Sequence, residues 1–422
     1  MTRSDTERHV EMRRLYLSAF AADLALNLVY ASIPFKALHL GASPLSQGSL
    51  GAAVMGAYAL MVRVSGRASD RLPRVTLARL SCVGILAGCL ALTSATSVTQ
   101  MLLAAPLLGG STAFFWPCVQ ASVGDRSSAA ELGRHLSRFN LSWSTGKGCG
   151  FFLAGALLAR FGPAFVITVA SCVAFAIFFV LPFSPFHAGR VAPEVVAGAP
   201  SPTSDTDRAR RFRRMAWLAN GAAYGVSATL TYHYPRLVEA HGWSPRVFGF
   251  FAGGIYATQT LVFIASTRWA RSWQFRRAPL YAPQLCLMAG IVSLPLATGA
   301  RLATTAVVFG VALAACYTAS IYYSLLGPAE RGRNAGMHES LIGFGSMCVP
   351  LAGGAVARAT ANAWAPYAVA GAVVLLSIVA QEIVSRVAAT RSPDTVRADD
   401  EMGRKKAASF DAAHEPWRQS QE

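Results

Sequence analysis

The stretch GRASDRLPR, residues 66–74, is a charged segment between two long apolar runs. The runs, residues 46–65 and 75–95, each have the length of about 20 residues that an α-helix needs to cross a bilayer. Charge confined to short turns between such runs is typical of membrane proteins with several spans. The stretch therefore predicts a helical membrane fold, and the sequence on both sides continues the pattern.

The composition agrees with this prediction. The chain has 422 residues, of which 53% are hydrophobic and 14% are charged, and its formal net charge is +17. A soluble domain has about 25% charged residues. A nucleic-acid-binding protein is also basic, but its Lys and Arg residues cluster among polar residues. Here the arginines separate apolar runs, so the expected partner is the lipid bilayer and no nucleic acid.

Apolar segments of spanning length recur along the chain, and we count twelve of them. They cover residues 15–36, 46–65, 75–95, 99–123, 138–159, 163–183, 215–236, 247–267, 280–299, 302–326, 336–357 and 361–385. We therefore predict an all-α integral membrane protein with twelve transmembrane helices.

Basic residues predict the orientation. Of the 38 Lys and Arg residues, 31 lie in the two termini and the even-numbered loops, six lie in the odd-numbered loops, and Lys147 lies inside an apolar segment. Loops rich in Lys and Arg stay in the cytoplasm. Both termini are therefore predicted to be cytoplasmic.

Two polar stretches divide the chain further. We expect a cytoplasmic N-terminus at 1–14, a six-helix lobe at 15–183, a second six-helix lobe at 215–386 and a disordered tail at 387–422. Residues 184–214 between the lobes are rich in Pro, Ser and Asp before an arginine run, which is typical of a flexible linker.

The two lobes share an internal repeat. ELGR at 131–134 matches ERGR at 330–333, and the same offset of 199 relates several residues of the following spans. The aligned pairs are Gly146 with Gly345, Cys149 with Cys348, and Gly155 with Gly354. An offset of 201 aligns Pro34, Ser43, Pro44 and Gly48 with Pro235, Ser244, Pro245 and Gly249. The repeat predicts two parallel, pseudo-symmetric halves.

The loop at 66–74 carries a resemblance to a known family. It is similar to the G-x-x-[SA]-D-R-x-x-R signature loop of the major facilitator superfamily, which lies between spans two and three. The matching residues are Gly66, Ser69, Asp70, Arg71 and Arg74. Pro73 departs from the pattern, because the family usually has Gly there. Together with the twelve spans, the linker and the two halves, the resemblance covers residues 12 to about 386.

The resemblance implies a secondary transporter in which two six-helix bundles rock around a midplane site. It also implies that the five matching loop residues form a conformational latch that stabilises the outward-facing state. Asp70 lies near a helix end, where its carboxylate can accept hydrogen bonds from Arg71, Arg74 or backbone N–H groups. The alternative is that these arginines only fix the topology.

The fifth span is similar to the G-x-x-x-G-P-x-x-G-G pattern of some antiporters. It keeps three of the glycines but has Phe151 for the proline and Ala154 for a glycine. The helix-packing residues predicted in spans five and eleven are Gly146, Gly150, Gly155, Gly345, Pro350 and Gly354. The pattern favours export coupled to proton entry; tight helix packing alone is the alternative.

Polar and aromatic residues inside the spans are the candidates for binding a substrate or a proton. They are Asp23, Asn27, Trp116, Asn140, Trp143, Lys147, Asn220, Tyr224, Tyr317, His338 and Glu339. Ionisable residues in a bilayer are expensive and are often functional. Uncharged polar residues also serve as contacts between helices, and His338 and Glu339 could instead form a solvated helix start.

Asp23 and Lys147 form a predicted pair. They lie at similar depths in spans one and five, about 12–14 Å from the cytoplasmic end at 1.5 Å per residue. An unpaired ammonium in hydrocarbon is unfavourable, so a partner or a wet cavity is required. We predict one polar site that holds both residues; a purely structural ion pair is the alternative.

No motif indicates an enzyme or a cofactor. The sequence has no HExxH or GxSxG, its cysteines form no CxxC pair, and TGKG at 145–148 lacks the first glycine and the Ser or Thr of a phosphate-binding loop. We therefore expect a monomeric secondary transporter of a small molecule in a bacterial inner membrane. Proton-coupled export is the first hypothesis, and uptake of a small organic anion is the second. A non-transporting receptor or scaffold is an alternative of another class.

Overall fold

A computed structural model describes residues 3–69, 71–127, 131–182, 203–266, 273–296, 298–326 and 331–387. Within these residues the chain is helical and contains no strand. The first half comprises α1 (Arg3–His39), α2 (Pro44–Ser69), α3 (Arg74–Ser94), α4 (Val98–Asp125) and α5 (Leu132–Val180). The second half comprises α6 (Thr203–Ala240), α7 (Pro245–Ser266), α8 (Ala278–Ser293), the short 3₁₀ helix Leu294–Leu296, α9 (Ala300–Leu325), α10 (Arg331–Thr360) and α11 (Ala365–Val387).

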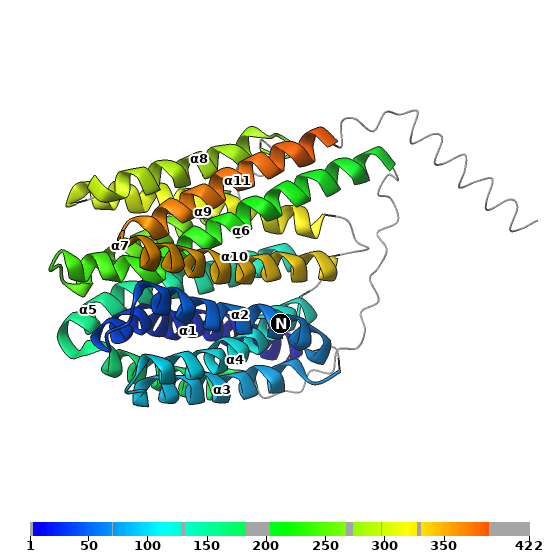
Figure 1. The fold of residues 1–422 in the computed structure, drawn as a ribbon. Coiled ribbons are helices and arrows are strands. Elements are labelled where there is room, and N and C mark those ends of the chain that lie inside the picture. The colour runs from blue at the N-terminus through cyan, green and yellow to red at the C-terminus, as the bar shows by residue number, and fades with distance from the viewer. Residues whose placement is uncertain are drawn as a thin grey trace, which may run out of the picture.

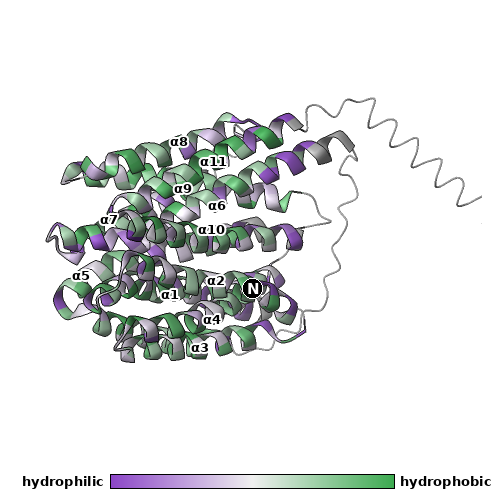
Figure 2. Cartoon of the chain, in the orientation of Figure 1, coloured by the Kyte–Doolittle hydropathy of each residue, from purple (hydrophilic) through white to green (hydrophobic). Residues whose placement is uncertain are grey.

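The helices form two bundles that lie side by side (Figure 1). Helices α1–α5 make the first lobe and α6–α11 make the second. We call the end where α1 and α6 begin and α11 ends the basic end, and the end with the α1–α2, α6–α7 and α10–α11 turns the opposite end. Figure 2 shows largely apolar helices whose hydrophilic residues lie mainly toward the two ends of the bundle.

Ten helices in the described part are long and apolar enough to cross a membrane. One of them, α5, has 49 residues, so it is about 73 Å long if straight, more than twice the thickness of a bilayer core. It covers the predicted spans 138–159 and 163–183, and the backbone leaves the helical conformation between them at Gly162 (φ 76°). Helix α6 is not among the ten, although it covers the predicted span 215–236. The count of twelve stays a prediction.

Two helices begin earlier than the sequence suggested. Helix α1 starts at Arg3, inside the predicted polar N-terminus, and α6 starts at Thr203, inside the predicted linker. The linker's last residues, 203–214, are therefore helical. The run has aspartates near its start and arginines after them, an order that suits the helix dipole, and arginine is a good helix former. The predicted tail beyond Val387 lies outside the described residues.

Glycines bring the helices of each lobe together. A Cβ added at Gly146 on α5 would collide with the backbone oxygen of Phe20 on α1, and one added at Gly345 on α10 would collide with the backbone oxygen of Gly221 on α6. The sequence repeat relates these two contacts, because the offset of 199 maps Gly146 onto Gly345 and the offset of 201 maps Phe20 onto Gly221. Small residues allow such close approach of membrane helices. Both lobes are thus built around the same kind of crossing.

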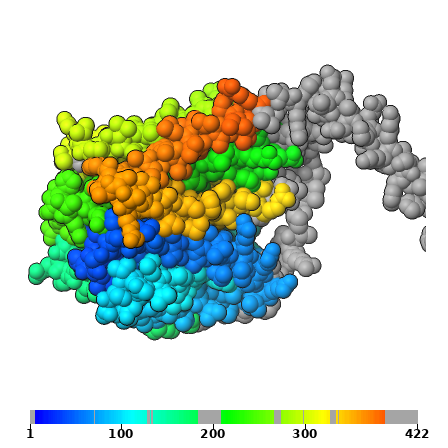
Figure 3. Space-filling view, in the orientation of Figure 1, coloured from blue at the N-terminus to red at the C-terminus, as the bar shows by residue number. Residues whose placement is uncertain are grey.

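Further glycine contacts join the two lobes near the opposite end. A Cβ at Gly155 on α5 would lie 2.6 Å from the Cα of Gly249 on α7. The repeat aligns Gly249 with Gly48 on α2, and a Cβ added at Gly48 would collide with the backbone of Pro350 on α10. We call these contacts the glycine seam. Toward the basic end, Figure 3 shows the surface hollowed between the end of α2 and the start of α10.

Candidate functional site

A cavity of about 170 Å³ lies between the lobes. Helices α1, α2, α4 and α5 wall it from the first lobe, and α6, α7, α9 and α10 wall it from the second. Nine of the eleven candidate residues from the sequence line it. These are Asp23, Asn27, Trp116, Asn140, Trp143, Lys147, Tyr224, Tyr317 and Glu339. The other two, Asn220 and His338, do not.

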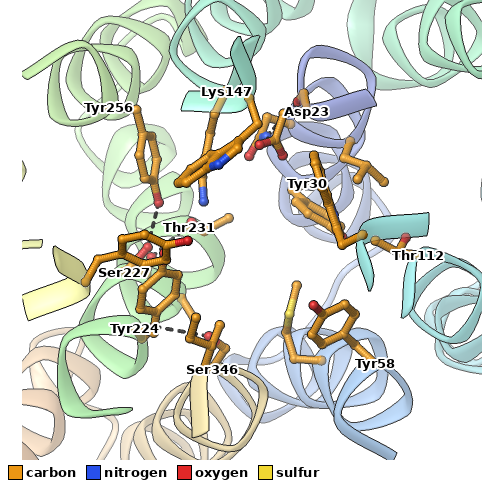
Figure 4. A pocket seen from close by; sticks show the side chains of 18 of the residues that line it. Asp23, Tyr30, Tyr58, Thr112, Lys147, Tyr224, Ser227, Thr231, Tyr256 and Ser346 are labelled. Atoms are coloured by element: carbon orange, nitrogen blue, oxygen red, sulfur yellow. Dashed lines mark hydrogen bonds between the residues drawn. The ribbon is translucent and has the colours of Figure 1, made fainter. Parts of the chain in front are cut away.

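Lys147 extends from α5 into the cavity (Figure 4). Its ammonium lies 4.3 Å from the ring centroid of Tyr256 and 5.8 Å from that of Tyr224. Cations are attracted to aromatic faces at such distances. Among the described residues, no hydrogen-bond acceptor or carboxylate contacts the ammonium. The lysine is therefore positioned by aromatic rings.

Asp23 lies beside Lys147 in the same cavity and is 8% exposed. Its side-chain oxygen accepts a hydrogen bond from the Asn27 amide (3.2 Å), which also donates to the Asp23 backbone oxygen (2.6 Å). No ion pair within 4.0 Å joins Asp23 to Lys147 in the described structure. The two residues share one polar site, as the spacing suggested, but without direct contact.

Aromatic rings from both lobes meet beside this site. Trp143 on α5 packs against Phe263 (5.8 Å between centroids) and Tyr317 (5.6 Å), which belong to α7 and α9. The Trp143 indole donates a hydrogen bond to the Asn140 side-chain oxygen at 3.0 Å. Trp116, which precedes Pro117 in α4, packs edge-on against Phe139. The cluster links the lobes through side chains, whereas the glycine seam links them through the backbone.

Glu339 on α10 accepts a hydrogen bond from the Tyr58 hydroxyl on α2 at 2.9 Å. This bond crosses from one lobe to the other. The preceding residue, His338, is fully buried and bonds the Ser320 hydroxyl through Nδ1 at 2.7 Å. Successive residues of an α-helix point about 100° apart, at 3.6 residues per turn. The two neighbours therefore face different surroundings, and only Glu339 reaches the cavity.

Asn220 is also fully buried and away from the cavity. Neither its amide nitrogen nor its amide oxygen has a hydrogen-bond partner among the described residues.

The signature loop is anchored within the first lobe. Arg74 pairs with Asp125 at the end of α4 (2.5 Å) and donates to the Ala121 backbone oxygen (3.2 Å). The Ser69 hydroxyl donates to the Gly66 backbone oxygen at 2.8 Å. Arg71 is exposed. Asp70 lies outside the described residues, so the predicted contacts of its carboxylate are not described either.

Sequence reasoning missed several cavity residues. Tyr58, Ser227 and Ser346 received no site role, although Ser227 bonds the Tyr256 hydroxyl at 2.6 Å and Ser346 bonds the Tyr224 backbone oxygen at 3.3 Å. The repeat contained a signal for Ser346, because the offset of 199 maps Lys147 onto it. Isolated serines and tyrosines in apolar runs carry no such signal.

The cavity offers one ammonium, two carboxyl groups, several hydroxyls and many aromatic rings. Among the described residues, no group of His, Cys, Asp or Glu side chains could hold a metal ion. Helices of spanning length around a central polar cavity, walled by two lobes, define a membrane transporter rather than an enzyme.

Comparison with known proteins identifies the family. Residues 15–326 match the sequence profile of the Major Facilitator Superfamily, so the chain belongs to that superfamily. It is similar in structure to the nucleoside transporter NupG (TM-score 0.68, 13% identity, 89% of this chain and 98% of that one). It is also similar to a bacterial homolog of the human lysosomal transporter Spinster in an inward-facing, unoccupied conformation (TM-score 0.59, 16% identity, 90% and 95%). At these identities the likeness shows the fold alone. No curated protein sequence matches the chain.

Proposed function

We propose that this protein carries a small organic anion together with a proton across a bacterial inner membrane by alternating access. One observation carries the proposal: a cavity between the lobes holds the ammonium of Lys147 and the carboxyl groups of Asp23 and Glu339. The ammonium attracts an anion. Protonation of a carboxyl group in the same cavity, which we assign to Glu339, removes a negative charge and strengthens that attraction, which couples the two ligands.

Glu339 is the proposed coupling residue that links proton binding to lobe movement. Its carboxylate accepts the Tyr58 hydroxyl across the lobe boundary. Hydrogen bonds to an ionised group are about twice as strong as neutral ones. Protonation of Glu339 therefore weakens a contact between the lobes while it favours anion binding. Proton and substrate would then travel in the same direction.

Export driven by proton entry is the second candidate function, supported by the glycine pattern of α5. The packing of these glycines offers another reason for the pattern. A Cβ at Gly150 would lie 2.7 Å from the Leu24 backbone oxygen, and Gly146 and Gly155 also make close backbone contacts. Because close packing accounts for these glycines, we favour cotransport. An inert receptor would need neither the Lys147 ammonium nor the buried carboxyl groups.

The membrane topology remains part of the proposal. We infer twelve spans, both termini in the cytoplasm, lobes at 15–183 and 215–386, and a monomer. The excess of Lys and Arg at the basic end supports this orientation. With the glycine seam packed at the opposite end, the cavity would then face the cytoplasm. Reporter fusions after residues 200 and 390 should both report the cytoplasm; a signal from outside at either position contradicts the topology.

Transport in proteoliposomes tests the function. Organic anions that raise the melting temperature of the purified protein are selected, since a ligand of the folded state stabilises it. Their uptake is then measured with and without an inward proton gradient. We expect the gradient to drive accumulation in wild type and in the control Glu382→Gln, whose carboxylate pairs with Arg386 on α11. Glu339→Gln should lose the gradient dependence. Equal uptake with and without a gradient in wild type contradicts the proposal.

A further inference from the structure

Lys147 is a cation whose hydrogen bonds are not made. Among the described residues that line the cavity, it is the one basic side chain. An ammonium has three N–H donors, and the described structure gives it aromatic faces but no acceptor. The Lys147 side chain is half-buried, so its ammonium is accessible from the cavity. A ligand carboxylate can therefore bind the ammonium without displacing a protein partner among the described residues.

The surroundings of the ammonium are aromatic. Ten of the 24 lining residues are Phe, Trp or Tyr, against 10% of the whole chain. The Tyr256 ring under the ammonium is held in place by the bond between its hydroxyl and Ser227. Aromatic side chains bind other rings edge to face or in offset stacks. Planar rings are thus the apolar groups that this lining suits best.

The size of the cavity is sufficient for a single ring. Its volume is about 170 Å³, and a cavity of about 150 Å³ is known to hold one benzene molecule. One six-membered ring with a small substituent fits this space. The cavity is partly open, so a substituent that points toward the opening is not limited by this volume.

We propose that the substrate is a single-ring aromatic carboxylate, with its carboxylate on Lys147 and its ring among the aromatic side chains around Tyr256 and Trp143. This inference rests on the proposed transport function and names its substrate class. The hydroxyl groups of Thr112, Thr231 and Ser346 lie on the same walls; each donates to a backbone oxygen and can still accept a hydrogen bond from a polar ring substituent.

Three probes of similar size separate charge from shape. Benzoate has the ring and the charge, benzamide has the ring without the charge, and cyclohexanecarboxylate has the charge without a flat ring. Binding is measured by the melting temperature of the purified full-length protein and by quenching of tryptophan fluorescence, since Trp116 and Trp143 line the cavity. We expect saturable benzoate binding, and affinities lower by about tenfold or more for both analogues, which corresponds to about 1.4 kcal/mol.

Two variants test whether Lys147 is the residue that binds the benzoate carboxylate. In Lys147→Met the preference for benzoate over benzamide should disappear. In the control Lys36→Met it should persist, because Lys36 lies outside the cavity and donates to the Leu92 and Thr93 backbone oxygens. If Lys147→Met does not fold, the comparison of probes in wild type still decides the question. Equal binding of benzamide or cyclohexanecarboxylate in wild type overturns the proposal, and so does the absence of benzoate binding at millimolar concentrations.

The two proposals fail in different ways. Benzoate binding without uptake driven by a proton gradient overturns the coupling and leaves the substrate class intact. Proton-driven uptake of another anion, with no benzoate binding, overturns the substrate class and leaves the coupling intact.

Discussion

The two lobes face the cavity through equivalent positions that carry different side chains. The repeat offset of 199 relates Lys147 on α5 to Ser346 on α10, and Asn140 to Glu339. All four residues line the cavity. The first lobe therefore places a cation where the second has a hydroxyl, and an amide where the second has a carboxyl group.

The packing of the same helices is alike in both lobes. Gly146 contacts the Phe20 backbone in the first lobe, and Gly345 contacts the Gly221 backbone in the second. A side chain at either glycine would push two helices apart, so these positions are restricted. Side chains that face the cavity have no such restriction. The difference teaches that the lobes share a framework and present different side chains to the cavity. In our proposal, the first lobe binds the anion and the second couples the proton.

The largest effect is expected where the lobes are alike. Gly146→Leu and Gly345→Leu should each prevent correct folding, because overpacking costs about 1–3 kcal/mol and more where backbone is the obstacle. Gel filtration and the melting temperature measure this. Gly336→Ala is the control, since no atom lies within 4 Å of its added Cβ. If only one leucine variant is disrupted, the two crossings are not equivalent.

Moving the cation between lobes should have the next largest effect. Lys147→Ser should lower the affinity for benzoate about tenfold or more, a loss of about 1.4 kcal/mol. Adding Ser346→Lys should recover part of it, because the ammonium then enters the same cavity from the equivalent position. Titration of tryptophan fluorescence gives the affinities. No recovery in a folded double variant would show that the first-lobe surroundings of Lys147 are indispensable.

Moving the carboxyl group of Glu339 to the equivalent position 140 of the first lobe should change the pH dependence of benzoate binding. In wild type, protonation of Glu339 removes a negative charge, so benzoate affinity should rise several-fold as pH falls from alkaline to mildly acidic values. Glu339→Gln should bind at alkaline pH as wild type does at acidic pH. Adding Asn140→Asp should restore the dependence from the other lobe. A Glu339→Gln protein with the wild-type pH profile would exclude Glu339 as the coupling group.

The smallest effect concerns the signature loop. Asp70→Asn should reduce the turnover of transport a few-fold and leave benzoate affinity unchanged, because a latch acts on the balance between conformations rather than on the cavity. Initial uptake rates at several benzoate concentrations distinguish a change in turnover from a change in benzoate affinity. Arg67→Gln, in the same loop, is the control. Lost binding with unchanged turnover per bound substrate would make Asp70 a site residue.

Much of this arrangement follows from the sequence. Apolar runs of spanning length indicated the helices, and ionisable residues in them indicated Asp23, Lys147 and Glu339, because a charge in an apolar run needs a reason. The sequence could not tell which of the adjacent residues His338 and Glu339 faces the cavity. The side of their helix that faces the cavity is known only when the neighbouring helices are in place.

Contacts between distant segments could not be predicted. The partner of Arg74 is Asp125, and the partner of Glu339 is Tyr58 in the other lobe. Nothing local in the sequence marks such pairs, which form only when the helices pack. For the same reason the sequence predicted one polar site for Asp23 and Lys147 but not that the packed helices hold the ammonium over the Tyr256 ring.

Whether Lys147 binds substrate or only balances Asp23 is decided by a charge-pair cycle. Asp23→Asn, Lys147→Gln and the double variant are compared by melting temperature and by proton-driven benzoate uptake in proteoliposomes. We expect the double variant to fold like wild type and to transport nothing, because the anion has lost its cation. Recovery of both folding and transport in the double variant would show a structural ion pair. Normal folding and transport by Lys147→Gln alone would also contradict the assignment of the substrate to Lys147.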